Sequence, residues 1–92
     1  RELFGAKEGS HATPSEVSVT QYAYPDAIKT AAMDPETAEA GGFYDARNFR
    51  RRHPDGRIGS APGLARPEHG QRLVEVAAAA IARQYTAFVD EA

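Results

Sequence analysis

The sequence pattern predicts two helices and long loops that belong to a larger α/β body. Two observations lead to this expectation. The C-terminal end forms a long amphipathic helix pattern, and its apolar stripe needs a sheet or other helices to cover it. The remainder offers one or two further helices and long loops, which do not make a convincing core. We therefore expect a larger α/β body that this chain completes.

Length and composition exclude several classes of protein. The chain has 92 residues, of which 41% are hydrophobic and 26% charged, with a net charge of -2. This balance does not indicate binding to nucleic acid or to a membrane surface. No apolar run approaches the ~18 residues that a membrane helix needs. The absence of cysteine excludes disulfides and thiolate zinc sites, and it fits a cytoplasmic location. Because Arg1 opens the chain, we expect a fragment or a processed product.

The first segment, residues 1–25, contains a loop of small residues followed by a helix start. Thr13 can accept a hydrogen bond from the backbone N–H of Glu16, and the Glu16 side chain can reach back to Thr13. Pro14 suits the first helical position because its missing N–H does no harm there. The helix should end near Ala23, just before the Tyr-Pro pair that disfavours helical backbone.

The second segment, residues 26–66, is a loop-rich excursion with many glycines and prolines. Asp45 can cap a short helix that runs through Phe49 toward Arg52. Residues 53–56, with the sequence His-Pro-Asp-Gly, are typical of a turn. A loop-rich span of this length is usually functional or packs on another part of a protein.

Three features of this segment allow more than one interpretation. The arginines at 50–52 could bind an anion, but a solvated helix face or a subunit contact is favoured, because the chain as a whole is acidic. His53 and Asp55 could bind a metal, but no third ligand lies at a suitable spacing, so a turn is favoured. Residues 56–60 lack the lysine of a phosphate-binding loop, and we expect them to support the loop near the active site.

The third segment, residues 67–92, is the terminal helix, expected from Pro67 to about Asp90. Pro67 and Glu68 suit its first turn, and His69 beside them should be exposed. Apolar side chains recur at three- and four-residue steps along it, namely Leu73, Val76, Ala77, Ala80, Ile81, Tyr85 and Phe88.

The residues best placed for chemistry are His11 and Glu16. His11 lies in the loop just ahead of a helix N-terminus, where the helix dipole favours negative charge. A carboxylate beside an imidazole raises its basicity and fixes its tautomer, so the imidazole can shuttle protons. The spacing alone also fits a capping role for Glu16 and a solvated loop position for His11.

The neighbouring residues resemble a conserved segment of the creatininase family. The stretch Gly9-Ser10-His11-Ala12-Thr13-Pro14-Ser15-Glu16-Val17-Ser18 matches it at His11, Glu16 and Ser18. A second match comprises residues 55–60, Asp-Gly-Arg-Ile-Gly-Ser, and residues 64–70, which open the terminal helix. The resemblance covers nearly the whole chain, and its two motifs occur in the family's order.

This resemblance implies a three-layer α/β/α fold with a mainly parallel sheet, of which the chain is the C-terminal portion. It also implies a metal-dependent amidohydrolase that cleaves a C–N amide bond in a small, often cyclic substrate. The catalytic residues would be His11, which gives a proton to the leaving nitrogen, and Glu16, which supports it. Glu8 and Ser10 would bind substrate. Lys7 stands where creatinine amidohydrolase itself has a tryptophan.

The cofactor implied by the family is a pair of divalent metal ions, zinc or manganese, with ligands outside this chain. Expected partners are the N-terminal part of the same fold, further copies in a homo-oligomer such as a hexamer, and a small-molecule substrate. Neither a nucleic acid nor a membrane is expected as a partner. The alternative from another class is a non-catalytic structural or interaction subunit.

Overall fold

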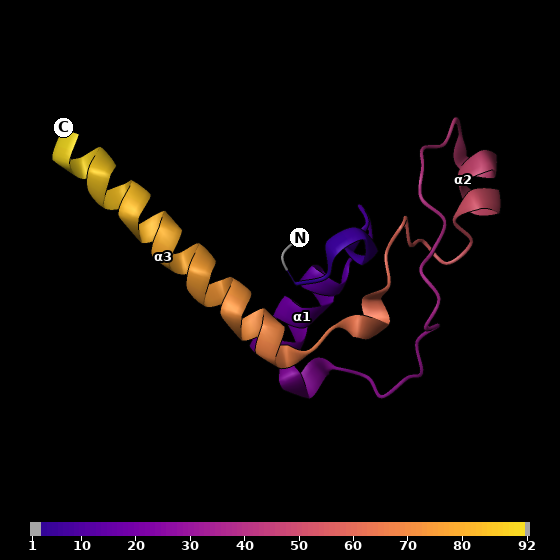
Figure 1. Cartoon of the computed structure of the whole chain (residues 1–92), viewed down its shortest axis with the longest axis horizontal. Helices are drawn as coiled ribbons and strands as arrows, with labels where there is room; N and C mark the ends of the chain where they lie inside the picture. Colours follow the sequence, from indigo (N-terminus) through magenta and orange to yellow (C-terminus); the bar gives the residue numbers. More distant parts are fainter. Residues whose placement is uncertain (1–2, 92) are drawn as a thin grey trace.

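The computed structural model describes residues 3–91, and the secondary structure within this range is helical. A long C-terminal helix projects from a smaller body that contains the other elements (Figure 1). The three α-helices are α1 (Pro14–Ala23), α2 (Ala46–Arg52) and α3 (Pro67–Glu91). Three short 3-10 helices connect them: η1 (Gly5–Glu8), η2 (Pro25–Ala27) and η3 (Pro62–Leu64).

The expected three-layer α/β/α arrangement with a mainly parallel sheet is wrong for this chain. Residues 3–91 contain no strand, and their β-type pairing is a single antiparallel bridge between His11 and Ile58. Glycines with positive φ lie close to both partners and break the extended backbone that a strand needs: Gly9 (67°) two residues before His11, and Gly59 (66°) directly after Ile58. The family resemblance suggested a sheet, whereas these local residues favour loops joined by isolated hydrogen bonds.

Helix α1 begins as the sequence predicts. The backbone N–H of Glu16 donates to the Thr13 hydroxyl at 3.1 Å, and the N–H of Thr13 donates to the Glu16 carboxylate at 3.1 Å. This reciprocal capping box satisfies two N–H groups that the first turn would otherwise leave unpaired. The helix ends at Ala23, and Tyr24 caps it by donating its N–H to the carbonyl of Thr20.

Helices α1 and α3 meet at a point where no side chain separates their backbones. A Cβ atom added to Gly70 would lie 1.9 Å from the carbonyl oxygen of Ser18, so only glycine permits this approach. Ser18 is fully buried there, and its hydroxyl accepts a hydrogen bond from the backbone N–H of Arg66 at 3.1 Å. The first turns of α3 are therefore anchored on α1.

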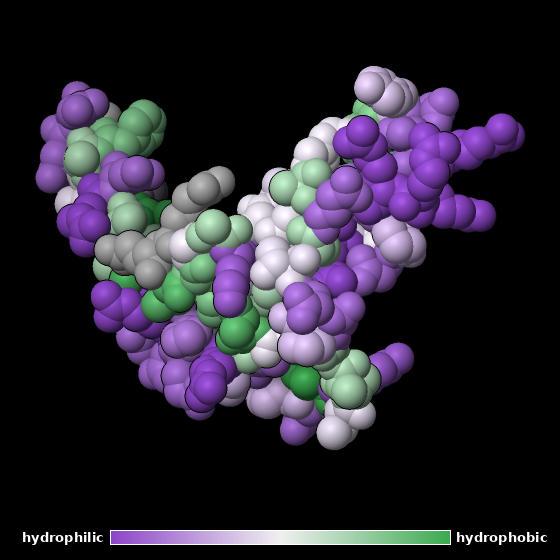
Figure 2. Space-filling model, turned by 45° about the vertical axis from the view of Figure 1, so that its right-hand side comes forward, coloured by the Kyte–Doolittle hydropathy of each residue, from purple (hydrophilic) through white to green (hydrophobic). Residues whose placement is uncertain are grey.

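The buried interior is small and largely polar. Ala61 and Pro14 are buried apolar residues of the described chain, and the buried polar residues are Thr13, Ser18, Asn48, His53 and Ser60. The apolar stripe of α3 is mostly exposed, including Ile81 at 65% and Phe88 at 70%. Hydrophobic residues accordingly form patches on the molecular surface (Figure 2). Hydrogen bonds rather than apolar contacts thus hold the body of the chain together.

Helix α2 lies at the far end of the body from α3 (Figure 1). Asp45 caps this helix, as the sequence predicts. The Asp45 carboxylate accepts from the N–H of Asn48 at 2.8 Å. His53 follows the helix and is 2% exposed, with its ring 5.3 Å from that of Phe49. The predicted turn at 53–56 is confirmed, since the Gly56 N–H donates to the carbonyl of His53 at 3.0 Å.

His69 departs from the expected exposure. It is partly buried in the first turn of α3, where its ring meets the edge of Phe4 at 5.2 Å. Contact with the apolar Phe4 ring accounts for the lower exposure of this histidine. None of the helices within residues 3–91 is long and apolar enough to cross a membrane.

Candidate active site

The His11 loop is held against residues 58–60 by main-chain hydrogen bonds. The Ser10 N–H donates to the carbonyl of Ile58 at 2.9 Å, and the Ile58 N–H donates to the carbonyl of His11 at 3.2 Å. The buried Ser60 hydroxyl also donates to that His11 carbonyl, at 2.7 Å. Residues 58–60 of the 56–60 segment therefore support the His11 loop as expected, whereas the place of this loop in an active site stays a prediction.

Gly9 allows the two segments to come this close. A Cβ atom at Gly9 would lie 2.4 Å from the carbonyl oxygen of Ile58 and 2.6 Å from that of Gly59. Its φ of 67° is also in the region that other residues rarely adopt. Both the conformation and the space at this position thus require glycine.

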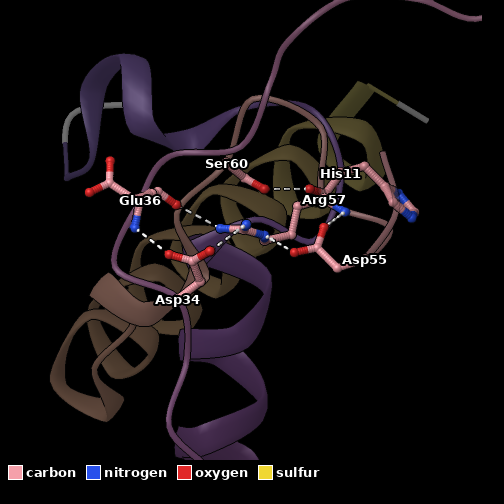
Figure 3. A network of polar contacts seen from close by, with 6 residues as sticks. All are labelled: His11, Asp34, Glu36, Asp55, Arg57 and Ser60. Carbon is pink, nitrogen blue, oxygen red and sulfur yellow. Dashed lines mark hydrogen bonds and ion pairs between the residues drawn. The ribbon is translucent and has the colours of Figure 1, made fainter. Parts of the chain in front are cut away.

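An arginine-centred cluster supports residues 55–60 from the other side (Figure 3). The Arg57 side chain donates from Nε to the Asp55 carboxylate at 2.7 Å and from Nη1 to the Glu36 carbonyl at 2.7 Å. Its Nη2 lies 3.6 Å from a carboxylate oxygen of Asp34. The backbone N–H of Arg57, and then its side chain, hold the pKa of Asp55 below its ordinary value. Arg57 thus joins two loops that are distant in sequence.

The N-terminus of α1 gathers the two predicted carboxylates. Glu8, at the end of η1, accepts a hydrogen bond from the Ser15 N–H at 3.1 Å. Glu16 accepts from the N–H and the hydroxyl of Thr13, both to the same oxygen. Negative charge is stabilised at a helix N-terminus by its dipole. The structure therefore brings Glu8 and Glu16 to one end of α1, each bound to helix-start backbone.

The side chains of Ser10 and His11 are exposed just ahead of this helix end. The His11 imidazole points away from Ser60 and the arginine cluster (Figure 3). No hydrogen bond within the described residues joins His11 to Glu16, whose bonds are those of the capping box. His11 is therefore held through its backbone while its ring is accessible from outside.

Two hollows lie near these elements. One of about 540 Å³ lies between α1 and α3 and is lined by Ser15, Glu16, Val19, Leu73, Val74 and Ala77. The other, of about 380 Å³, is lined by residues of the 28–35 loop and of 61–65, with Gln21. Of the predicted site residues, Glu16 lines the first hollow and none lines the second.

A family comparison agrees with the motifs around this loop. The sequence model described as Creatininase: Creatinine amidohydrolase matches residues 2–85. The chain belongs to the creatininase family. A comparison with curated proteins finds no match.

Creatininase family enzymes are generally metal-dependent, which raises the question of whether this chain holds metal ligands. Residues 3–91 contain no group of three histidine, aspartate or glutamate side chains that could hold one. Asp55 is bound to Arg57, and His53 is buried against Phe49. The described residues therefore do not fit a metal site.

Sequence reasoning missed two features of this candidate site. The first is the hydrogen bond from the Ser60 hydroxyl to the His11 carbonyl. A serine after the glycine of the Asp-Gly-Arg-Ile-Gly-Ser motif is a small polar residue suited to a buried hydrogen bond. The second is the hydrogen bond that the Glu8 carboxylate accepts from the Ser15 N–H, since the sequence predicts only substrate binding for Glu8. A carboxylate close before a helix start is a signal for that bond.

Proposed function

We propose that this chain is the C-terminal part of a metal-dependent amidohydrolase that cleaves a C–N amide bond in a small substrate, including cyclic amides. The creatininase family match supports the reaction class. The observation that carries the proposal is the His11 loop, which presents an exposed imidazole beside the N-terminus of α1 while Ile58 and Ser60 hold its backbone.

In the proposed reaction His11 gives a proton to the departing nitrogen. Amide nitrogen is a poor leaving group until it is protonated, so a positioned acid is needed at that atom. The exposed ring can reach a substrate without any change in the backbone. Glu16 lies at the start of the helix that follows, and its proposed role is to support His11. Both roles concern residues of this chain alone.

Glu8 and Ser10 are proposed to bind the substrate. Ser10 is exposed next to His11, and its hydroxyl can donate to or accept from a polar substrate group. One Glu8 oxygen accepts the Ser15 N–H, which leaves its other oxygen for a substrate N–H. Small amides with free N–H groups, cyclic ones included, can donate to these acceptors.

Zinc or manganese is proposed as the cofactor, with ligands outside this chain, because the described residues do not provide them. The ion would supply Lewis-acid activation of the reacting groups when bound. The N-terminal part of the same fold is the proposed partner that brings those ligands. Assembly into a homo-oligomer such as a hexamer, and a cytoplasmic location, are part of the same proposal.

The test compares His11→Ala with the parent in the complete protein that carries this sequence, with His69→Gln as the histidine control. Hydrolysis is followed as ring opening of creatinine and as amine release from a formamide and a short peptide. We expect His11→Ala to lower turnover about 10²- to 10⁴-fold, the usual contribution of a general acid, with an unchanged circular dichroism spectrum. Near-parental turnover in His11→Ala would show that the assigned role is wrong.

A non-catalytic structural or interaction subunit is the second candidate. The exposed apolar stripe of α3, with Tyr85 at 69% and Phe88 at 70%, favours it. The two candidates differ in the metal content of the complete protein. Bound zinc or manganese together with amide hydrolysis supports the enzyme, and a metal-free protein inactive on all three substrates supports the structural role.

A further inference from the structure

We propose that Ser60 is a positioning residue for His11: its buried hydroxyl fixes the His11 peptide so that the imidazole faces the substrate. This inference rests on the proposed function, in which His11 is the proton donor. Ser60 does not touch the substrate in this scheme. It acts through the main chain of the loop.

The first support is the conformation of the loop itself. Ala12, next to His11, has a φ of 54°, and Gly9 on the other side has a φ of 67°. A left-handed conformation is costly for alanine, and such backbone persists only where its surroundings hold it in place. Residues 9–12 therefore need an external hold, and residues 58–60 provide it.

The second support is the atom that Ser60 contacts. The His11 carbonyl accepts from the Ser60 hydroxyl at 2.7 Å and from the Ile58 N–H at 3.2 Å. Two donors on one carbonyl fix the peptide plane that follows the His11 Cα. The bond from the Ser10 N–H to the Ile58 carbonyl holds the chain on the other side of His11. The His11 backbone is thus held on both sides, and its ring extends to the side opposite Ser60 (Figure 3).

The third support is that Ser60 is itself held firmly. Its side chain is 0% exposed, and its carbonyl accepts the Ala38 N–H at 3.0 Å. Gly59 donates its N–H to the carbonyl of Glu39 at 2.9 Å. Together with Arg57, these bonds attach residues 57–60 to the 34–39 loop. The Ser60 hydroxyl is therefore held in place by the 34–39 loop.

The test compares Ser60→Ala with Ser18→Ala in the complete protein. Both serines are 0% exposed and the hydroxyl of each makes one hydrogen bond to a distant segment, but only the Ser60 hydroxyl reaches His11. We expect Ser60→Ala to lower kcat by roughly 10- to 100-fold at nearly unchanged KM, because small displacements of a reacting group have costs of this size. Ser60→Cys places a weaker donor in a similar volume, and its kcat should lie between that of Ser60→Ala and that of the parent. Ser18→Ala should keep parental kcat.

A second readout does not depend on turnover. The carbonyl ¹³C resonance of His11, measured by NMR, should shift in Ser60→Ala and stay in place in Ser18→Ala. If His11→Ala lowers kcat while Ser60→Ala leaves kcat and this resonance unchanged, the positioning role is wrong and the proposed function stands. If His11→Ala keeps parental turnover, the proposed function fails, and the positioning role fails with it.

Discussion

Replacement of Gly70 by alanine should destabilise the protein although alanine is the better helix former. Gly70 lies in α3 where that helix crosses α1, and the new Cβ would be 1.9 Å from the Ser18 carbonyl oxygen and 2.9 Å from the Val19 nitrogen. Carbon contacts are comfortable near ~3.5 Å, so the two backbones must separate by roughly 1.5 Å. Because the nearest atoms are backbone, no side-chain rotation can relieve the clash.

Three contributions set the size of the effect. Alanine in place of glycine inside a helix gains about 1 kcal/mol. Forcing a close-packed contact apart costs typically ~1–3 kcal/mol. The separation also breaks the bond from the Arg66 N–H to the buried Ser18 hydroxyl, which contributes about 1 kcal/mol. We therefore expect Gly70→Ala to lower the free energy of unfolding by about 1–3 kcal/mol.

The assay is urea unfolding followed by circular dichroism at the helical minimum, with equal m-values as the sign that only stability has changed. Gly42→Ala is the control, because an added Cβ there meets nothing within 4 Å and the backbone is not left-handed. That variant should be neutral or stabilised by up to about 1 kcal/mol. If Gly70→Ala were as stable as Gly42→Ala, the backbone contact between α1 and α3 would be refuted.

Three further predictions concern the site. Gly9→Ala should be more destabilising than Gly5→Ala, because both glycines have positive φ but only Gly9 would place a Cβ against another segment; thermal unfolding of the two variants checks this, and equal losses would contradict it. The contact between Asp55 and Arg57 should stabilise the folded protein at pH values above the ordinary carboxyl pKa of about 4. This stabilisation should be lost as the pH falls through the lowered pKa of Asp55. Unfolding of Asp55→Asn and parent from pH 7 to pH 2 should therefore converge at the acid end, and a constant difference would oppose the prediction. Thr13→Ala should cost about 1 kcal/mol through loss of the α1 cap, whereas Thr13→Ser should stay near the parent; an alanine variant as stable as the serine variant would argue against the cap.

The helices could be predicted from sequence because their signals are local. Thr13, Pro14 and Glu16 specify the start of α1 within four residues, and Asp45 does the same for α2. The end of α3 at Glu91 is one residue from the expected Asp90. Capping and three- to four-residue spacing act within one or two turns, so neighbouring residues suffice to reveal them.

The fold class and the support of the site could not be predicted in the same way. The sheet was expected from resemblance, whereas the positive φ values at Gly9 and Gly59 prevent strands in the segments that do pair. The bond from Ser60 to His11 spans 49 positions, and no local pattern encodes its partner. The roles of His11 and Glu16 in catalysis stay predictions, while the capping role of Glu16 is confirmed.

The length of α3 has a consequence for hydrogen exchange. Its 25 residues extend about 37 Å at 1.5 Å per residue. Helix α1 approaches it closely at Gly70 and lines one hollow together with Leu73, Val74 and Ala77. Amide protons in these first turns are shielded by a neighbouring helix, so their exchange should report the opening of the whole α1–α3 contact. Beyond Ile81 the helix is largely solvated, and there the same measurement should report only the local helix–coil equilibrium. A rise in protection beyond Ile81 on assembly would thus reveal when a partner covers this end of α3.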